Sequence, residues 1–463
     1  MFKNINKELW LDEFKKTYVI AWPLILTQLL HTSLSATDVL MMGWLGPKYL
    51  AAGGTASSFY FTFVVFGMGV VGAVAPLVAQ AIGAKNLTAV RRSLRQGVWV
   101  ALLLAMFLII ILFQAETIFV ILKQSKESSA LGAGYLNYAS WSLFPILLMV
   151  AFRSFLSGHN DTKIILLITI IGFFLNLVGN AAFMFGQWGA PRMELEGAGL
   201  VTSFVQLIST TLVILYIIFG KKYKHYEIFV RFWRPDWDKF QEILRVGVPI
   251  GFTVMSEVGL FSAAYFLMGM LSTEETAAHA VALQIASITF MIPFGLSFAT
   301  TVRVGLAYGQ GSKIAIYYSA WVSIILSFVL MLFTCAAFIL LPEIFVHLFL
   351  DPNLEKNVTA IGLAISYLAI AGIFQLVDGV QVTCAAALRG LSDTKTPMYI
   401  ALVGYWLFGF PISYLLAFTF ELRGVGVWIG LAASLAFVAV GLLIRFIYRE
   451  KYIFKGNGLE ILQ

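Results

Sequence analysis

Three carboxylates, Asp38, Glu257 and Asp378, lie inside long apolar stretches of this sequence. Each costs about 2.5–3.5 kcal/mol at the centre of a bilayer on insertion scales, so three cost up to roughly 10 kcal/mol without compensation. Lys and Arg occur only near the ends of these stretches, so no internal ion pair is predicted. The sequence therefore predicts that the acids bind protons, alkali cations or a cationic substrate from solution. The alternative is that they hydrogen-bond to neighbouring helices for packing alone.

Near Glu257 and Asp378, the acids in the second half of the chain, the helical spacing predicts a binding site lined by polar and aromatic side chains. Gln381 follows Asp378 by three residues and Phe374 precedes it by four, so the three share one helix face. An acid, an amide and an aromatic ring suit an organic cation, through charge pairing and cation–π contact. For Phe374, ordinary packing in the core or against lipid is the alternative interpretation.

In the first half, hard oxygen ligands accompany Asp38. Asn176 and Asn180 are spaced i, i+4 on one predicted helix, and Thr202 lies on the next. Such oxygens are the ligands that hard cations prefer, although membrane Asn also joins helices by hydrogen bonds. His31 precedes Asp38 by two turns and could pass protons near neutral pH, a plain hydrogen bond to a neighbouring helix being the alternative.

The composition requires that helices in a membrane position these groups. Of 463 residues, 60% are hydrophobic and only 12% charged, with a mean hydropathy of +0.87. That leaves no polar coat for a soluble enzyme or a nucleic-acid-binding domain, despite the net charge of +7. The sequence contains no ATP-binding or hydrolase motif, and its two cysteines predict no disulfide framework. We therefore expect an all-α integral membrane protein that is not an enzyme and has no cofactor.

Apolar runs of about 20 residues predict transmembrane helices. Twelve occur, at approximately 18–42, 50–82, 93–114, 130–156, 163–187, 195–219, 242–271, 276–308, 315–341, 357–388, 397–420 and 424–447. The runs at 130–156 and 276–308 are the ones in which we expect interruptions. With the N-terminus inside, 25 of the 31 Lys and Arg residues fall on the inner side, which predicts that both termini are cytoplasmic.

The chain repeats itself once. The matching segments are Phe14–Pro23 with Phe240–Pro249, Gly83–Lys85 with Gly311–Lys313, Ser157–Lys163 with Arg389–Lys395, and Gly197–Gly199 with Gly424–Gly426. Each half holds six predicted helices, so both enter the membrane in the same sense and form a parallel repeat. We expect a first lobe at residues 1–226 and a second at 227–463, joined by the basic segment 221–239, with a cavity at their seam.

Together these features resemble the multidrug and toxic compound extrusion (MATE) transporters, most of all their NorM branch. The resemblance rests on TDVLMMGWLG around Asp38, VPIGFTVMSEVG around Glu257, QLVDGVQV around Asp378 and the turn RGLSDTK, and it covers nearly the whole chain. It implies two six-helix lobes in a V, in a bacterial inner membrane. It also implies export of amphipathic cationic drugs or dyes by alternating access, driven by entry of Na⁺ or H⁺.

In the family that this sequence resembles, acids matching Glu257 and Asp378 couple cation to drug. A second cation site is formed by residues matching Asp38, Asn180, the carbonyl of Ala198, and Thr202. Sodium and protons both remain open: the oxygens near Asp38 favour sodium, while Met184, where some relatives have an acid, and His31 favour protons. We expect a monomer whose partners are the drug, the coupling ion and the lipid bilayer.

Two other functions stay open at this point. A flippase for lipid-linked oligosaccharides of the same superfamily would need a basic cavity for pyrophosphate. A passive channel or a sensor would show flux without counter-ion dependence, or no flux.

Overall fold

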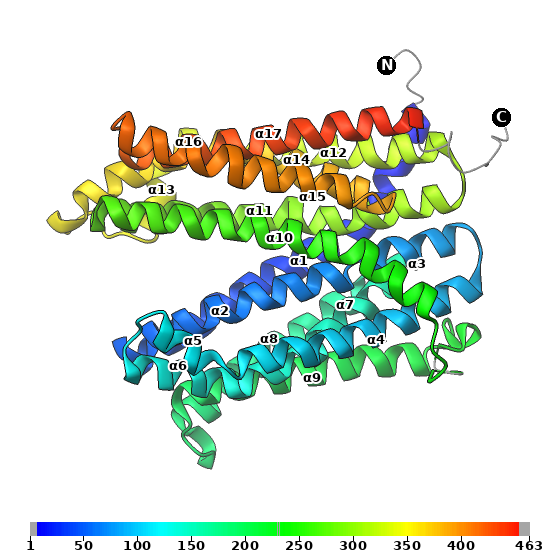
Figure 1. Cartoon of the computed structure of the whole chain (residues 1–463), viewed down its shortest axis with the longest axis horizontal. Coiled ribbons are helices and arrows are strands. Elements are labelled where there is room, and N and C mark those ends of the chain that lie inside the picture. Colours follow the sequence, from blue (N-terminus) through cyan, green and yellow to red (C-terminus); the bar gives the residue numbers. More distant parts are fainter. Residues whose placement is uncertain (1–6, 229, 231, 453–463) are drawn as a thin grey trace. The chain divides into compact units, whose positions relative to one another are not determined.

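The computed structural model describes residues 7–228, 230 and 232–452. Within them the α-helices are α1 (Lys7–Leu45), α2 (Pro47–Val71), α3 (Val74–Gly83), α4 (Leu87–Leu112), α5 (Ala115–Ile121), α6 (Lys126–Ala139), α7 (Leu143–Gly158), α8 (Lys163–Phe185), α9 (Glu194–Phe219), α10 (Trp237–Leu271), α11 (Thr273–Gly309), α12 (Lys313–Leu340), α13 (Pro342–His347), α14 (Val358–Gly390), α15 (Lys395–Leu402), α16 (Phe410–Tyr414) and α17 (Arg423–Tyr452) (Figure 1). The all-helical fold is confirmed, and twelve helical spans in this part of the chain are long and apolar enough to cross a membrane.

Three of the spans depart from regular α-helix. The predicted helix 130–156 consists of α6 and α7 joined by a 3₁₀ turn at Ser140–Ser142. The predicted helix 50–82 consists of α2 and α3, separated at Gly72. The eleventh span contains two π-helical segments, Val403–Gly409 and Leu415–Thr419. No interruption is found in 276–308, because α11 continues through Pro293.

The helices belong to two compact units that divide inside α1 and inside α10. Unit 1 comprises residues 1–25 and 252–463, and unit 2 comprises residues 26–251. In unit 1, α14 packs against α11, α12 and α17; in unit 2, α9 packs against α6, α7 and α8. Each division falls two residues after the helix proline of the repeat, Pro23 or Pro249. Residues 1–25 thus belong to the unit that holds most of the second half, and residues 227–251 to the unit that holds most of the first half. The predicted division at residue 226 assigns each of these segments to the other unit.

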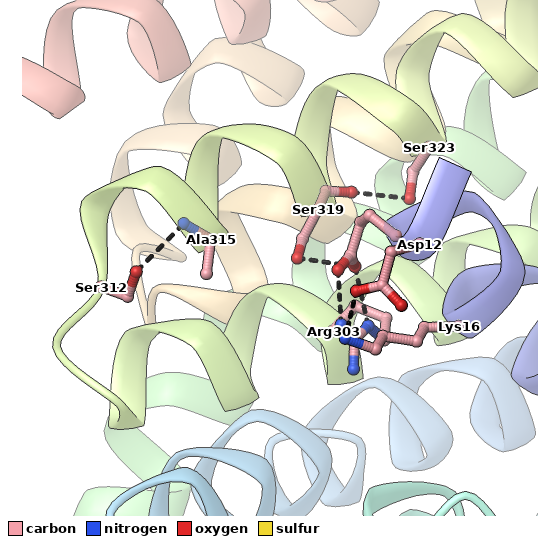
Figure 2. A network of polar contacts seen from close by, with 8 residues as sticks. Asp12, Lys16, Arg303, Ser312, Ala315, Ser319 and Ser323 are labelled. Carbon is pink, nitrogen blue, oxygen red and sulfur yellow. Dashed lines mark hydrogen bonds and ion pairs between the residues drawn. The ribbon is translucent and has the colours of Figure 1, made fainter. Parts of the chain in front are cut away.

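A buried ion pair fixes the first half of α1 in unit 1. Arg303 of α11 donates through Nε and Nη2 to the two carboxylate oxygens of Glu13, at 2.8 and 2.5 Å, and Ser319 of α12 adds a third bond at 2.8 Å. Figure 2 shows Arg303 and Ser319 converging there, beside the exposed pair of Asp12 and Lys16. The Glu13 side chain is only 8% exposed, so its charge depends on these donors.

The first half of α10 is fixed in unit 2 by close backbone contact and by one ion pair. A Cβ on Gly247 would lie 2.1 Å from the carbonyl oxygen of Val70, and a Cβ on Gly69 would lie 2.6 Å from Gly251 Cα. Only glycine permits α10 to approach α2 so closely. Before the helix begins, Asp236 accepts two hydrogen bonds from Arg92 of α4, at 2.5 and 2.9 Å.

The two repeats share turn geometry. Asn160 and Ser392 occupy equivalent places in the repeated turn, and both adopt left-handed backbone, with φ of 58° and 57°. In each copy the amide of the next residue donates to the carbonyl oxygen five residues earlier, at 3.0 and 2.9 Å. The predicted repeat is therefore visible in the backbone of these turns.

At another repeated turn, the structure corrects the register of the match. The left-handed residues are Lys85, with φ of 53°, and Gly311, with φ of 69°. Each precedes a helix-capping side chain, Asn86 before α4 and Ser312 before α12. Lys85 is thus equivalent to Gly311, whereas the sequence match paired Gly83 with Gly311, two residues out of register.

The aspartates of the repeated D-T-K turns hold those turns to later parts of their own halves. Asp161 accepts hydrogen bonds from Tyr223 (2.6 Å) and Tyr216 (2.8 Å), and Asp393 accepts one from Arg445 (2.9 Å). Burial raises the pKa of Asp161, but the two phenol donors and a nearby lysine outweigh burial and bring its pKa below the ordinary value. These conspicuous sequence motifs therefore have a structural role at the helix ends.

Candidate functional site

The first group of predicted residues meets in unit 2. Asn180 of α8 donates from Nδ2 to Asp38 Oδ1 of α1 at 2.6 Å, and also to Asn176 Oδ1 at 3.1 Å. Both asparagines are buried, and Asp38 is half-buried. Asn176 Nδ2 and Asn180 Oδ1 have no hydrogen-bond partner among the described residues. The spacing of the two asparagines, one helical turn apart, is what places both beside a single carboxylate.

The remaining residues predicted for this site have contacts of their own. Thr202 donates from Oγ1 to the carbonyl oxygen of Ala198 within α9 (2.9 Å), so these two form a pair of their own. Met184 is fully buried at the end of α8. His31 is exposed on α1, and the charge of Arg153 in α7 acts on it. The hydrogen bonds of this site join Asp38 to its two asparagines, and the parts predicted for Ala198, Thr202 and His31 stay predictions.

The second group meets in unit 1. Glu257 of α10 is half-buried, whereas Asp378 and Gln381 of α14 are 3% and 2% exposed. The Glu257 carboxylate interacts with the side chains of Gln381 and Tyr405, and its charge acts on Asp378. Asp378 Oδ1 and Gln381 Oε1 have no partner among the described residues. Two carboxylates, an amide and a phenol thus gather with acceptor oxygens still free.

Tyr405 is a residue of this group that the sequence reasoning missed. It is fully buried in the π-helical segment Val403–Gly409, and its hydroxyl accepts a hydrogen bond from Gln381 Nε2 at 2.9 Å. π-Helical segments occur often at functional sites because they displace side chains from the regular helical positions. The sequence signal was a tyrosine between two glycines, Gly404 and Gly409, in an otherwise apolar helix.

Phe374 lies one turn from Asp378 but packs among aromatic rings. Its ring meets Trp428 edge-on at 6.0 Å and Phe261 at 6.4 Å, and it is 3% exposed. Its predicted place in a substrate cavity stays a prediction, and its contacts are those of a core residue.

The predicted absence of basic partners for the three acids holds for ion pairs but not for longer-range charge. Within the described residues, Asp38, Glu257 and Asp378 form no ion pair with Lys or Arg. Arg389 at the end of α14 nevertheless extends its charge to Glu257. The same part of the chain holds no group of three or more His, Cys, Asp or Glu that fits a transition metal. The groups present suit protons, hard monovalent cations or organic cations.

Comparison with known proteins identifies the family. The MatE family model matches residues 23–182 and 249–415. The chain belongs to the MatE family. A probable multidrug resistance protein NorM of Agrobacterium fabrum is 41% identical to this MatE protein over 442 residues, covering 96% of this chain and 95% of the relative. One from Mesorhizobium japonicum is 39% identical over 447 residues, covering 96% of each.

Solved structures show the same fold. A eukaryotic MATE transporter matches with a TM-score of 0.85 at 21% identity, covering 95% of this chain and 96% of the other. A multidrug resistance MATE transporter of the MOP superfamily, solved in an outward-facing conformation, matches with a TM-score of 0.86 at 19% identity, covering 97% and 99%. This MatE protein is therefore a multi-pass membrane transporter and not an enzyme.

Proposed function

We propose that this MatE protein exports amphipathic cationic organic compounds in exchange for Na⁺ or H⁺ by alternating access. The gathering of Glu257, Asp378, Gln381 and Tyr405 in unit 1, with acceptor oxygens left unpartnered among the described residues, carries this proposal. Two neighbouring acids without an ion-paired base bind cations, because a bound cation or proton removes the cost of a buried charge. The NorM relatives are named as probable multidrug resistance proteins, which supports the drug as the second ligand.

Coupling follows from competition for the same carboxylates. Drug and coupling ion each favour the conformation in which they bind more tightly, and neither shifts the equilibrium beyond that difference in affinity. Glu257, Asp378, Gln381 and Tyr405 supply charge and polar contacts for either ligand. An incoming ion that neutralises the acids would release the drug, and the drug would in turn release the ion.

The Asp38 site is proposed as a second coupling site. As the amide of Asn180 stands, its Nδ2 donates to Asp38 while its Oδ1 is unpartnered. Sodium binding would require the Asn180 amide to rotate, so that Asn180 Oδ1 and Asn176 Oδ1 both face the ion. Binding of a proton would need only Asp38. Sodium coupling thus predicts strong dependence on both asparagines, and proton coupling predicts dependence on Asp38 alone.

The orientation proposed from the charges places both termini in the cytoplasm of a bacterial inner membrane. The basic segment between α9 and α10 and the basic ends of the chain support this orientation. Residues 1–6 and 453–463 lie outside the described residues.

Ethidium efflux from reconstituted vesicles tests the proposal. Flux is driven first by a sodium gradient at constant pH and then by a pH gradient without sodium. We expect one gradient to drive efflux, and Glu257→Gln or Asp378→Asn to reduce that flux at least tenfold. Asp12→Asn is the matched control, because it also removes one carboxylate charge but from an exposed surface pair.

Native rates in both site variants would contradict the proposed coupling. Flux under neither gradient would favour the lipid-linked oligosaccharide flippase. Ethidium flux that runs only down its own gradient and needs no ion gradient would indicate a passive channel.

A further inference from the structure

A second cluster of buried polar atoms lies in unit 1, where α11 and α17 begin. Five side-chain atoms there have no hydrogen-bond partner among the described residues: Glu275 Oε2, His279 Nδ1, His279 Nε2, Tyr367 OH and Trp428 Nε1. Glu275 is 2% exposed and the other three residues are fully buried. Buried polar groups are almost always satisfied, so five such atoms together indicate an occupant.

Contacts between rings and helices place these side chains in one cluster. The Trp428 ring of α17 lies 5.4 Å from the His279 ring of α11 and stacks on the Tyr367 ring of α14 at 6.1 Å. Glu275 precedes His279 by one turn of α11, so both lie on the same face. Arg423 donates from Nε to the other Glu275 oxygen, Oε1, at 2.9 Å.

Gly424 allows two of the polar atoms to come together. A Cβ at this position would lie 1.9 Å from Tyr367 OH and 2.3 Å from Glu275 Oε2. Both atoms therefore pack against the α17 backbone at one point, where the Cβ of any other residue would overlap them. The glycine and the two inward-directed side chains leave polar groups facing a shared position.

The chemistry of the donors and acceptors identifies the occupant. Trp428 Nε1 is a donor only and Glu275 Oε2 an acceptor, while a neutral His279 supplies one of each and Tyr367 OH either. A metal cation needs acceptors only, and the positive charge of Arg423 is already paired with Glu275, so it leaves no free charge for an anion. Water donates and accepts, and a buried water usually makes about three hydrogen bonds. The mixture fits water better than any ion.

We propose that Glu275, His279, Tyr367 and Trp428 hold ordered water, and that this hydrated cluster is the approach by which the coupling ion reaches Asp378. Tyr367 lies eleven residues before Asp378 on the same face of α14, about 16 Å away along the helix. Phe374 lies between them on that face and packs against Trp428. On this approach, Phe374 is the apolar step that the ion must pass between the hydrated cluster and the carboxylate site. The proposed route of the coupling ion rests on the proposed function, whereas the proposed ordered water in the cluster does not.

Tyr367→Phe tests the water directly, because it removes one unpartnered oxygen and keeps the ring. In a dry cluster, loss of a buried unsatisfied hydroxyl leaves the melting temperature unchanged or raises it. In a hydrated cluster, the water loses a partner and the melting temperature falls by several degrees. A maleimide that fluoresces on reacting with Cys335 and Cys384 reports this, since both are buried in unit 1. Tyr399→Phe, at an exposed tyrosine, is the control.

Radiolytic hydroxyl-radical labelling of the wild-type protein is an independent test. Radicals form from water, so buried rings beside ordered water are oxidised and dry ones are protected. We expect Trp428 and Tyr367 to be oxidised at least several-fold faster than Phe338 and Phe446, which are buried in the same unit. Equal protection of all four rings, or a melting temperature of Tyr367→Phe at or above wild type, would overturn the water site.

Transport by Tyr367→Phe tests the approach separately. We expect the coupling-ion concentration for half-maximal ethidium efflux to rise several-fold while the maximal rate is retained. An unchanged ion dependence would overturn the approach but not the water. Absence of ion-driven efflux in the wild type would instead contradict the proposed function, and the melting and labelling results would still decide the water.

Discussion

Replacing Glu13 with Gln removes one charge of a buried pair and is expected to destabilise unit 1 strongly. Arg303 and Ser319 together donate three hydrogen bonds to this carboxylate, and its side chain is 8% exposed. Breaking one partner of a buried ion pair costs about 3–5 kcal/mol, because the other charge stays buried. At about 2–4 °C per kcal/mol for a unit of 150–250 residues, the melting temperature should fall by about 6–20 °C.

The assay uses the two cysteines as reporters of that unit. Cys335 and Cys384 are the only cysteines of the sequence, and both are buried in unit 1, so maleimide fluorescence rises when this unit opens. Asp12→Asn is the matched control, because it changes the same charge one residue away in a pair whose side chains are more than half exposed. Exposed pairs contribute about 0–1 kcal/mol, so the control should shift by no more than about 4 °C.

A double-mutant cycle separates pairing from simple loss of a charge. Arg303→Met alone leaves Glu13 buried without its main donor, and the combination with Glu13→Gln leaves no buried charge. We expect the double variant to be more stable than the sum of the two single effects predicts. Additive effects, or a Glu13→Gln shift equal to that of Asp12→Asn, would refute the reasoning that this pair anchors α1.

Three further predictions concern other contacts. Asp236→Asn should lower stability by about 1–2 kcal/mol at pH 7, measured by chemical unfolding, because it loses charge-assisted bonds from Arg92. Those bonds hold the pKa of Asp236 below its ordinary value. The stability difference between wild type and Asp236→Asn should therefore persist above about pH 4 and disappear as pH falls through the lowered pKa. A stability difference that persists to low pH would contradict an origin in the Asp236 charge. Tyr405→Phe should weaken coupling-ion binding about 10-fold or more in vesicle assays, because a hydrogen-bonding partner of Glu257 is lost; an unchanged ion dependence would remove Tyr405 from the site. Gly247→Ala should destabilise unit 2 by about 1–3 kcal/mol, since its Cβ would overlap a carbonyl oxygen of α2; wild-type stability in chemical unfolding would show that the helices can separate there.

The helices could be predicted because their signal is local. A run of apolar residues is stable in a membrane only as a helix, which satisfies its own backbone hydrogen bonds, so hydropathy alone locates the spans. The places where these helices depart from regular α-helix were harder to predict from the sequence. The long run at 276–308 continues through Pro293, while 397–420, which holds Pro411 in a comparable place, contains two π-helical segments. Packing against α17 accompanies those segments, and such packing is not encoded in hydropathy.

Part of each candidate site could also be predicted. Acids in apolar helices are costly enough to stand out, and residues one turn apart, such as Asn176 and Asn180, share a face in any helix. Tyr405 could not be assigned, because its approach to Gln381 joins α14 to a different helix. Arg389 was expected at a helix end, yet its charge reaches Glu257 because a long side chain can extend along the helix.

By itself, the sequence determined the class of the protein, the number of spans, the repeat and the identity of the acids, because composition, periodicity and the cost of a buried charge depend on the chain alone. Only the tertiary structure decided which unit holds each half of α1 and α10, that Glu13 pairs with Arg303, and that Glu275, His279, Tyr367 and Trp428 gather their unpartnered atoms together. These contacts join residues tens to hundreds of positions apart, and their distances follow from how the helices pack rather than from local sequence.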